Sequence, residues 1–299
     1  MIEPTTAHLP ALPALALSEA QFRRVSELVT GTAGIQLRPG KENLVRARLA
    51  KRLRALALPT VQDYLDIVDR DATGRELAEL VDVLTTNKTA FFREPDHFRL
   101  LQQTVLPSLA RTGAPIRIWS AGCSSGQEAY SIAMVVRETL GPAASRVSIL
   151  ATDISQRVLQ RAHAAEYLVR ELGDMPTDVR RAHFDTVPDA RDTVRIAPAT
   201  RALVRIAPLN LIAEWPEQGP FDVIFCRNVM IYFDKPTQER LVSRFAAQLS
   251  AGGHLMLGHS ESLSGVRHGL AYVQPATYQR TAPLPSVPGN RLDASMITL

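Results

Sequence analysis

The strongest constraint on the fold is an alternation of short apolar runs with helical patterns in the second half of the chain. Short runs with few polar residues are typical of strands that are buried on both faces. Helices between such strands act as crossovers, which makes the strands parallel. We therefore predict an α/β domain with a parallel sheet covered on both faces. The expected strands are Ile116–Ala121, Val147–Ala151, Phe221–Cys226 and Gly253–Gly258, and the expected helices are Gln127–Leu140, Ser155–Ala165 and Thr237–Leu249.

The N-terminal part of the chain has a purely helical pattern. Ser18 is a suitable helix N-cap because Gln21 follows three residues later, and Gly31 and Gly34 are expected to end this first helix. Four more helices are expected at Lys41–Leu56, Val61–Val68, Arg75–Leu84 and Phe98–Leu109. We predict a loose arm at residues 1–17, a helical domain at 18–85, the α/β domain at 86–281 and a disordered tail at 282–299.

Two nearly identical segments lie inside the expected α/β domain. Val194–Pro198 reads Val-Arg-Ile-Ala-Pro, and the same five letters recur at Val204–Pro208. Alternating runs a few residues apart are typical of an antiparallel pair. We expect such a pair in a small β insert at residues 166–205, although a repeat this short can also arise by chance.

Composition limits the possible partners and compartments. The net charge of +4 permits nucleic acid as a partner but does not require it. Cys123 and Cys226 have no Cys or His at metal-ligand spacing, so we expect two reduced thiols and no metal site. The N-terminus lacks the features of a signal peptide, and there is no apolar stretch of about 18 residues. These features favour a soluble, cytoplasmic protein.

A strand, a glycine-flanked turn and a helix start follow one another at Ile116–Glu128. The turn glycines, Gly122 and Gly126, would let the backbone approach a ligand closely. Asp153 ends the next strand, where an acid accepts hydrogen bonds from ribose hydroxyls in dinucleotide-type folds. The turn lacks the full Gly-x-Gly-x-x-Gly pattern, and Glu128 would repel a pyrophosphate. The pattern favours S-adenosylmethionine over a dinucleotide, with an ordinary turn and a surface acid as the alternative.

The same turn also fits the Gly-x-Ser-x-Gly nucleophile elbow of serine hydrolases. That interpretation needs a later acid, Asp222 or Asp234, and then a histidine such as His259. Hydrolase nucleophiles normally follow several earlier strands, whereas this turn follows the first expected strand. We therefore expect Ser124 and Ser125 to be loop residues.

Three further segments carry polar groups that suit a binding site. Thr85–Glu94 combines polar side chains with Phe91 and Phe92, which could also be packing residues. Asn210 could contact an adenine edge or close a turn. Arg227 and Asn228 follow a buried strand, at the sheet edge where α/β folds bind ligands. An arginine there needs an anion, which could be a ligand or one of Asp222 and Asp234.

Together these segments resemble the CheR-type chemotaxis receptor glutamate methyltransferases. The resemblance covers residues from about Ser18 to Arg280, and it departs from the family pattern at Gln127 and Ala129, where Glu and Pro are common. It implies a helical domain followed by a Rossmann-like methyltransferase domain with a small antiparallel β insert. The motifs are Thr86–Glu94, Trp119–Glu128, Ala151–Asp153, Asn210–Leu211, Phe225–Phe233 and Gly258–Ser262.

The resemblance also implies an activity. Members transfer a methyl group from S-adenosylmethionine to receptor glutamates, which gives γ-methyl esters and S-adenosylhomocysteine and needs no metal. We expect Arg93 and Tyr232 to hold the substrate carboxylate or the methionine end of the cofactor. The residues expected to line the cofactor pocket are Asn87, Thr89, Arg93, Glu128, Asp153, Asn210, Leu211, Arg227 and Asn228.

A basic helix suggests a partner. Val45, Leu49 and Leu53 share one face of the helix Lys41–Leu56, and four basic residues occupy the other. Such a face is usually only solvated, but the resemblance implies an acidic partner, the cytoplasmic methylation region of chemoreceptors. The β insert could bind a receptor C-terminal tail, and the enzyme would be recruited to membrane chemoreceptor arrays. The basic residues are Arg48, Lys51, Arg52 and Arg54.

Two other functions compete with this one. A nucleic-acid methyltransferase should show base-stacking aromatics among its basic residues, but aromatic residues make up only 6% of this chain and do not interleave with the basic helix. A non-catalytic adaptor on the same fold would have lost one of Glu128, Asp153 and Arg227, and all three are present.

Overall fold

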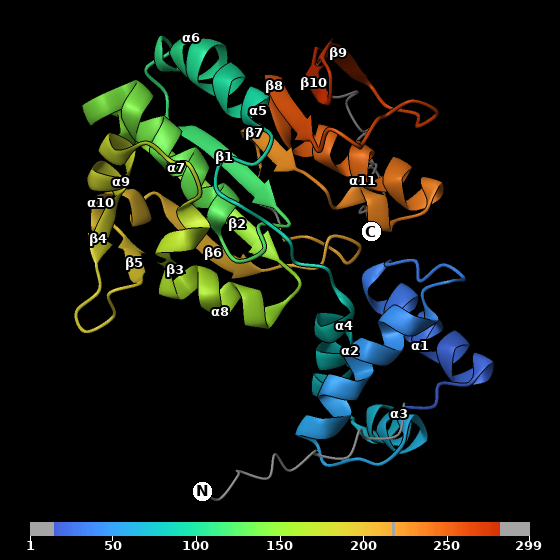
Figure 1. Cartoon of the computed structure of the whole chain (residues 1–299). Coiled ribbons are helices and arrows are strands. Elements are labelled where there is room, and N and C mark those ends of the chain that lie inside the picture. Colours follow the sequence, from blue (N-terminus) through green and yellow to red (C-terminus); the bar gives the residue numbers. More distant parts are fainter. Residues whose placement is uncertain (1–14, 217–218, 282–299) are drawn as a thin grey trace, which may run out of the picture.

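The computed structural model describes residues 15–216 and 219–281. Four helices form a separate lobe beside the sheet (Figure 1). They are α1 (Glu19–Ala33), α2 (Glu42–Ala55), α3 (Val61–Arg70) and α4 (Arg75–Leu84). Residues 1–14 of the arm expected at 1–17, and the whole tail expected at 282–299, lie outside the described residues.

Helix α1 begins where predicted and continues past Gly31 to Ala33. Ser18 and Gln21 form the predicted capping box. Gly31 lies within the helix, so the expectation that it breaks the helix was wrong; the helix ends at Gly34, whose φ is 72°. A left-handed residue of this kind is a common helix C-cap because only glycine adopts it without a Cβ clash.

The main sheet is mixed, with the strand order β6-β2-β1-β7-β8-β10-β9. The pairs from β2 to β8 are parallel, as predicted. Strand β6, which was expected in the antiparallel insert, also pairs parallel with β2, whereas β10 is antiparallel to both β8 and β9. The last two strands were not predicted. The strands are β1 (Ile116–Ala121), β2 (Val147–Asp153), β6 (Val204–Pro208), β7 (Phe221–Cys226), β8 (Leu249–Leu257), β9 (Leu270–Gln274) and β10 (Thr277–Arg280).

Alternate residues of the central strands face two different cores. Ile118 of β1 packs in the core that contains α7 (Gln127–Leu140) and the helical segment Pro95–Ala110. Its neighbour Trp119 packs in the opposite core, against Phe245 of α11 (Lys235–Gln248). This arrangement explains why apolar residues occur at both odd and even positions of the strand, since both of its faces are covered. Segment Pro95–Ala110 comprises α5 (Pro95–Leu100), the π-helical turn η1 (Leu101–Val105) and α6 (Leu106–Ala110), and α8 (Gln156–Ala164) follows β2.

The small antiparallel sheet is present, but the predicted pairing within it was wrong. Val194–Pro198 and Val204–Pro208 do not pair with each other. The first lies mainly in β5, the middle strand of a three-stranded sheet, and the second forms β6 at the edge of the main sheet. Pro198 explains the separation, because it begins a short helix that turns the chain from one sheet into the other. The insert contains β3 (Glu166–Leu168), η3 (Val169–Leu172), α9 (Thr177–His183), β4 (Phe184–Thr186), β5 (Thr193–Ile196) and α10 (Pro198–Arg201).

The helical lobe contacts the α/β domain at the end of α1. Gln36 donates from its backbone N–H to the carbonyl of Tyr232 at 2.9 Å. A Cβ on Gly34 would lie 2.9 Å from Cγ2 of Ile212, so glycine is needed there for close packing as well as for its φ. No helix in the described part of the chain is long and apolar enough to cross a membrane.

Candidate cofactor and active site

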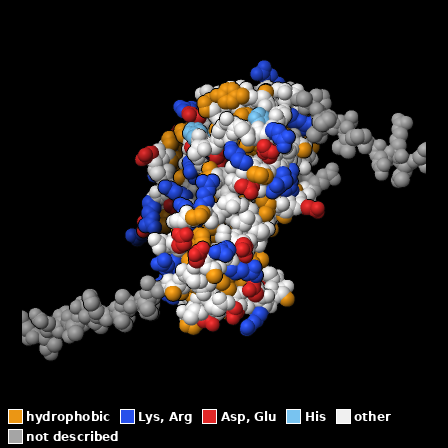
Figure 2. Space-filling view, turned by 90° about the vertical axis from the view of Figure 1, so that its right-hand side faces the viewer, with side chains coloured by type: hydrophobic (Ala, Val, Ile, Leu, Met, Phe, Trp, Pro, Cys, Tyr) orange, Lys and Arg blue, Asp and Glu red, His pale blue; other side chains and the backbone are white. Residues whose placement is uncertain are grey.

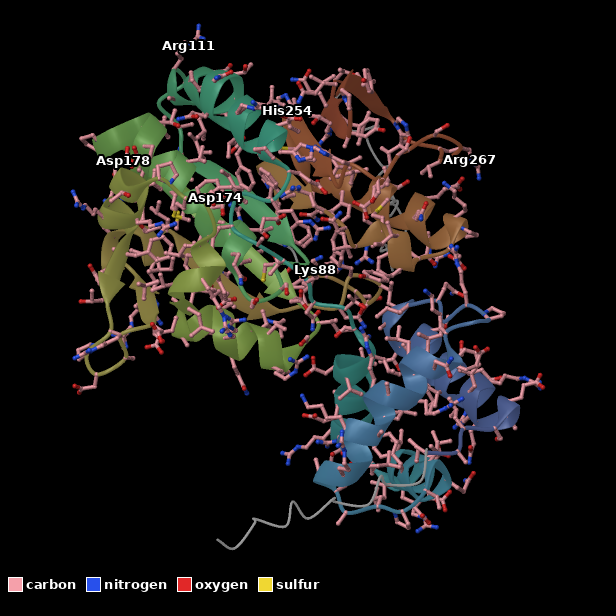
Figure 3. The ribbon with its side chains drawn as sticks, in the orientation of Figure 1. Lys88, Arg111, Asp174, Asp178, His254 and Arg267 are labelled. Atoms are coloured by element: carbon pink, nitrogen blue, oxygen red, sulfur yellow. The ribbon has the colours of Figure 1, made fainter. Side chains whose placement is uncertain are left out.

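A cleft lies between the helical lobe and the carboxyl edge of the parallel strands. Its empty volume is about 950 Å³, including the solvent-open mouth. Figure 3 labels Lys88 on the connector that crosses between the two lobes, and this residue also lines the cleft. The lining includes every residue predicted for the cofactor and for catalysis: Asn87, Thr89, Arg93, Glu128, Asp153, Asn210, Leu211, Arg227, Asn228 and Tyr232.

The glycine turn is tightly packed where it meets the cleft. Gly122 has a φ of 88°, and a Cβ there would lie 2.4 Å from Cγ2 of Val229. Gly126 has a φ of 94°, and a Cβ there would lie 2.8 Å from the hydroxyl of Tyr167. Both positions therefore require glycine on two grounds, backbone conformation and space.

The two serines of this turn are structural. Ser124 donates from its hydroxyl to the carbonyl of Asn87 at 3.1 Å, and Ser125 donates to Oε1 of Gln127 at 2.8 Å. A serine nucleophile needs a hydrogen bond to a general base, and neither acceptor is one. The geometry therefore does not support the hydrolase alternative.

Asp153 is held rigidly at the tip of β2. Its Oδ2 accepts from the backbone N–H of Ser124 at 2.8 Å, and its Oδ1 accepts from that of Ser155 at 3.0 Å. Burial raises the pKa of Asp153, and these backbone hydrogen bonds act in the opposite direction. A carboxylate offers about four acceptor positions, so two such bonds leave acceptor capacity for hydroxyl groups in the cleft.

Arg227 forms the centre of a buried ion network. Its Nη1 lies 3.1 Å from Oε2 of Glu128, and its Nη2 lies 3.0 Å from Oε2 of Glu94. The Arg227 side chain is 2% exposed. Its anions are thus two glutamates within the protein, and neither of the predicted candidates, Asp222 and Asp234, is among them. Burial raises the pKa of Glu128, while the Arg227 guanidinium opposes that shift.

Glu94 and Glu261 fix the loop after β7 through hydrogen bonds, although nothing in the sequence pattern singles them out within their motifs. Glu94 accepts from Nδ2 of Asn228 at 3.2 Å and from the backbone N–H of His259 at 3.1 Å. Glu261 is buried and accepts the backbone N–H groups of Gly258, Asn228 and Ile231 at 2.6, 2.8 and 3.2 Å. Their only sequence signal was an acid at a fixed place in a family motif, which gives no partner.

Several non-glycine residues around the cleft adopt left-handed backbone conformations. The φ values are 51° at Phe92, 56° at Glu94, 51° at Ser124 and 59° at Asn228. Such conformations cost free energy and persist where surrounding contacts fix them, often at functional sites. The carboxylates described above supply those contacts for Glu94 and Asn228.

Two of the three predicted asparagines, Asn87 and Asn210, use their side chains for hydrogen bonds to other parts of the protein. Asn210 donates from Nδ2 to the carbonyl of Thr32 at 2.6 Å and accepts the N–H of Ile212 at 3.1 Å. The turn-closing alternative for Asn210 is therefore realised, and the residue also joins the two lobes. Asn87 donates from Nδ2 to Oγ1 of Thr85 at 3.1 Å.

Arg93 and Tyr232 both donate hydrogen bonds to backbone carbonyls of the connector. Arg93 donates from Nη1 to the carbonyl of Lys88 at 3.0 Å, and its side chain is 37% exposed. Tyr232 donates from its hydroxyl to the carbonyl of Thr86 at 3.4 Å. Both polar groups retain access to a ligand, in contrast to the buried Arg227, whose two Nη atoms are paired with glutamates.

The four predicted basic residues of α2 do not form one free surface. Arg52 pairs with Glu76 at 2.6 Å and with Glu79 at 3.3 Å, and Arg48 faces the end of α4. Lys51 and Arg54 are exposed. In Figure 2 the smaller, lower lobe carries both acidic and basic side chains on the face shown.

One cluster has the composition of a metal site. The ligand atoms of Glu94, His97 and His259 lie within 4.8 Å of one another. The Glu94 carboxylate, however, already has the Arg227 guanidinium as its counter-ion. Neither ring nitrogen of the buried His97 has a hydrogen-bond partner among the described residues.

The fold and the cleft define a nucleoside-binding α/β enzyme with a helical N-terminal domain. Residues 87–278 match the family described as CheR methyltransferase, SAM binding domain, and residues 20–85 match CheR methyltransferase, all-alpha domain. The chain belongs to the CheR methyltransferase family and is an S-adenosylmethionine-dependent methyltransferase.

Curated relatives give the same assignment. The chain is 42% identical over 254 residues to the chemotaxis protein methyltransferase of Klebsiella aerogenes, covering 84% of this chain and 86% of the relative. It is 42% identical over 252 residues to that of Escherichia coli, covering 84% and 87%. It is also 42% identical over 260 residues to a probable chemotaxis protein methyltransferase of Rhizobium etli, covering 85% and 97%.

His97 gives a prediction about stability. Burial, followed by the charges of Arg227 and His259, lowers the pKa of His97 from 6.5 to about 4. Between these pH values the unfolded chain binds a proton that the folded chain excludes, so folding weakens as the pH falls. We expect this histidine to cost about 2 kcal/mol of unfolding free energy between pH 7 and pH 5.

The measurement is denaturant unfolding of the wild type and His97→Leu across this pH range. The variant should lose less stability than the wild type as the pH falls. Equal pH dependence of the two proteins would contradict the prediction.

Proposed function

We propose that this enzyme methylates glutamate side chains of chemoreceptors, forming glutamate 5-O-methyl esters and S-adenosylhomocysteine. The cleft is the observation that carries the proposal, because it combines a ribose-type acid at Asp153 with a glycine turn. The relatives named chemotaxis protein methyltransferase supply the substrate class. We assign the helical domain to residues 18–85, the methyltransferase domain to 86–281 and its β insert to 166–205.

The residues of the cleft fit S-adenosylmethionine. Asp153 has acceptor capacity for ribose hydroxyls, and the turn at Gly122 allows backbone to lie against a ligand. The carboxylate of Glu128, which lines the cleft, suits the cationic methionine end better than a phosphate. The cofactor supplies the methyl group. In this proposal Asn87, Thr89, Asn210, Leu211, Arg227 and Asn228 complete the cofactor-lining set.

The chemistry places few demands on acid–base groups. A glutamate carboxylate has an ordinary pKa near 4.3 and is already an anionic nucleophile at neutral pH. The protein must therefore orient the reactants and keep water away from them. Arg93 would hold the substrate carboxylate by charge, and the Tyr232 hydroxyl would orient it.

The proposed partner is the cytoplasmic methylation region of chemoreceptors, at membrane receptor arrays. Lys51 and Arg54 are the exposed cations of α2 that would meet an acidic helical surface. The outer strands β3 and β4 of the insert would offer an edge for a receptor tail. An adaptor without cofactor is disfavoured because Glu128, Asp153 and Arg227 all line the cleft.

Replacing Asp153 tests the placement of the cofactor. We expect Asp153→Asn to weaken S-adenosylhomocysteine binding by about 10- to 100-fold, since charged hydrogen bonds contribute about 1.5–3 kcal/mol each. Calorimetric titration measures this change, and Asp178→Asn on the distant helix α9 (Figure 3) is the matched control. In the same preparation, the wild type should transfer labelled methyl groups to receptor-containing membranes as a base-labile product.

Unchanged affinity in folded Asp153→Asn would show that the cofactor binds elsewhere. A base-stable product, or one confined to nucleic acid, would overturn the proposed reaction.

Arg93 and Tyr232 are tested by single-turnover kinetics. Removing a group that orients the reactants should slow the chemical step, so Arg93→Ala and Tyr232→Phe should each lose at least about tenfold in rate. The controls are Arg111→Ala, at an exposed arginine after α6, and Tyr272→Phe, whose tyrosine is 64% exposed. If both test variants retain the control rates, neither residue takes part in the mechanism.

The exposed cations of α2 should affect the encounter with the receptor and leave cofactor binding intact. Lys51→Glu and Arg54→Glu should raise the KM for receptor and reduce its dependence on salt, because screened attraction is the effect that they remove. Arg267→Glu, whose side chain is 94% exposed on the other lobe, serves as the control. An unchanged receptor KM in both α2 variants would make this face a solvated surface only.

A further inference from the structure

Arg48 points from the middle of α2 to the end of α4. Its Nη1 donates to the carbonyls of Leu84 and Thr85, the latter at 3.1 Å, and its Nη2 donates to Oγ1 of Thr86 at 2.8 Å. Leu84 is the last residue of α4, where carbonyls lack helical partners and the helix dipole is negative. The guanidinium thus caps a neighbouring helix and fixes the first residues of the connector.

The same connector forms one wall of the cofactor cleft. Residues 84–90 line it, and two hydrogen bonds join the connector to the opposite wall. Tyr232 donates to the carbonyl of Thr86, and Ser124 in the glycine turn donates to the carbonyl of Asn87 at 3.1 Å. A shift of the residues held by Arg48 would therefore move the lining of the cleft.

A second contact from the helical domain reaches the ribose-type acid. Asp82 of α4 is buried, and it accepts a hydrogen bond from the hydroxyl of Ser155. The backbone N–H of Ser155 in turn donates to Oδ1 of Asp153 at 3.0 Å. Ser155 thus links α4 to Asp153, the proposed ribose-binding carboxylate.

From these contacts we infer that Arg48 is a positioning residue for the cofactor cleft, through which the helical domain sets cofactor affinity. This role differs from that proposed for the exposed Lys51 and Arg54, since the Arg48 guanidinium is committed to three acceptors within the protein. Asp82 links the same helix, α4, to Ser155 and through it to Asp153 on the other side of the cleft. The inference rests on the proposed placement of S-adenosylmethionine in this cleft.

Arg48→Lys separates positioning from receptor attraction. Lysine retains the positive charge on α2, but its single ammonium cannot reproduce the planar fork that contacts three acceptors. We expect S-adenosylhomocysteine to bind at least about fivefold more weakly to Arg48→Lys, measured by calorimetry without receptor. In steady-state assays the KM for S-adenosylmethionine should rise while the KM for receptor stays unchanged. Arg70→Lys, the same substitution at an 82% exposed arginine of α3 in the same lobe, should show wild-type affinity for S-adenosylhomocysteine.

Thermal unfolding of each variant separates positioning from simple loss of stability. A residue with only a structural role would lower the unfolding temperature and leave the affinity of the folded protein unchanged, and that result would overturn the inference. A raised receptor KM with normal S-adenosylhomocysteine binding would also overturn it and would return Arg48 to the receptor-facing surface.

Asp153→Asn distinguishes failure of this inference from failure of the proposed function. If Asp153→Asn loses affinity and Arg48→Lys does not, only the role of Arg48 is wrong. If both variants bind S-adenosylhomocysteine normally, the placement of the cofactor in this cleft is wrong, and the inference fails with it.

Discussion

The buried guanidinium of Arg227 is the interaction on which the site depends. It joins Glu94 from the connector to Glu128 from the start of α7, and it lies at the end of β7. Burying three charges is costly, and removing one partner of a buried ion pair commonly costs about 3–5 kcal/mol. The network is therefore stable only when all of its segments are in place. The network also fixes how these segments pack together, because Glu94 accepts hydrogen bonds from Asn228 and from the backbone N–H of His259 as well.

This arrangement makes the cleft a product of the whole chain. The connector, the glycine turn, the end of β7 and the loop after β8 meet at one group of carboxylates. The helical domain contacts the residues around the cleft through Arg48, Asp82 and the carbonyl of Thr32. Arg48 binds the connector, Asp82 binds Ser155, and Thr32 binds Asn210. In this structure a domain that could be regarded as a separate receptor-binding module forms one wall of the site.

The sequence predicted the components of this site better than it predicted their pairing. The carboxyl ends of parallel strands must meet at one sheet edge, so Asp153 and Arg227 could be placed together in advance. The partners of Arg227 could not be predicted, because Glu94 and Glu128 lie about a hundred residues or more away from it in the chain. The predicted pairing of Val194–Pro198 with Val204–Pro208 was wrong for a related reason. An alternating pattern indicates a strand but does not indicate which strand it pairs with. The short helix that begins at Pro198 directs the two segments into different sheets. Arg48 looked like a surface cation because the helical wheel contains no information about the end of α4.

The charges of the cleft change from the interior to the mouth. In the buried part of the lining, the carboxylates of Glu128 and Asp153 outnumber the single guanidinium of Arg227, which also pairs with Glu94. Lys88 and the partly exposed Arg93 supply positive charge where the connector meets solvent. A negative interior suits a sulfonium and an ammonium group, and such a ligand would favour the ionised forms of carboxylates whose pKa burial raises. A positive mouth suits the glutamate anion that would accept the methyl group. The same gradient would repel a substrate carboxylate from the interior, so electrostatics alone would separate the two reactants into their proper positions.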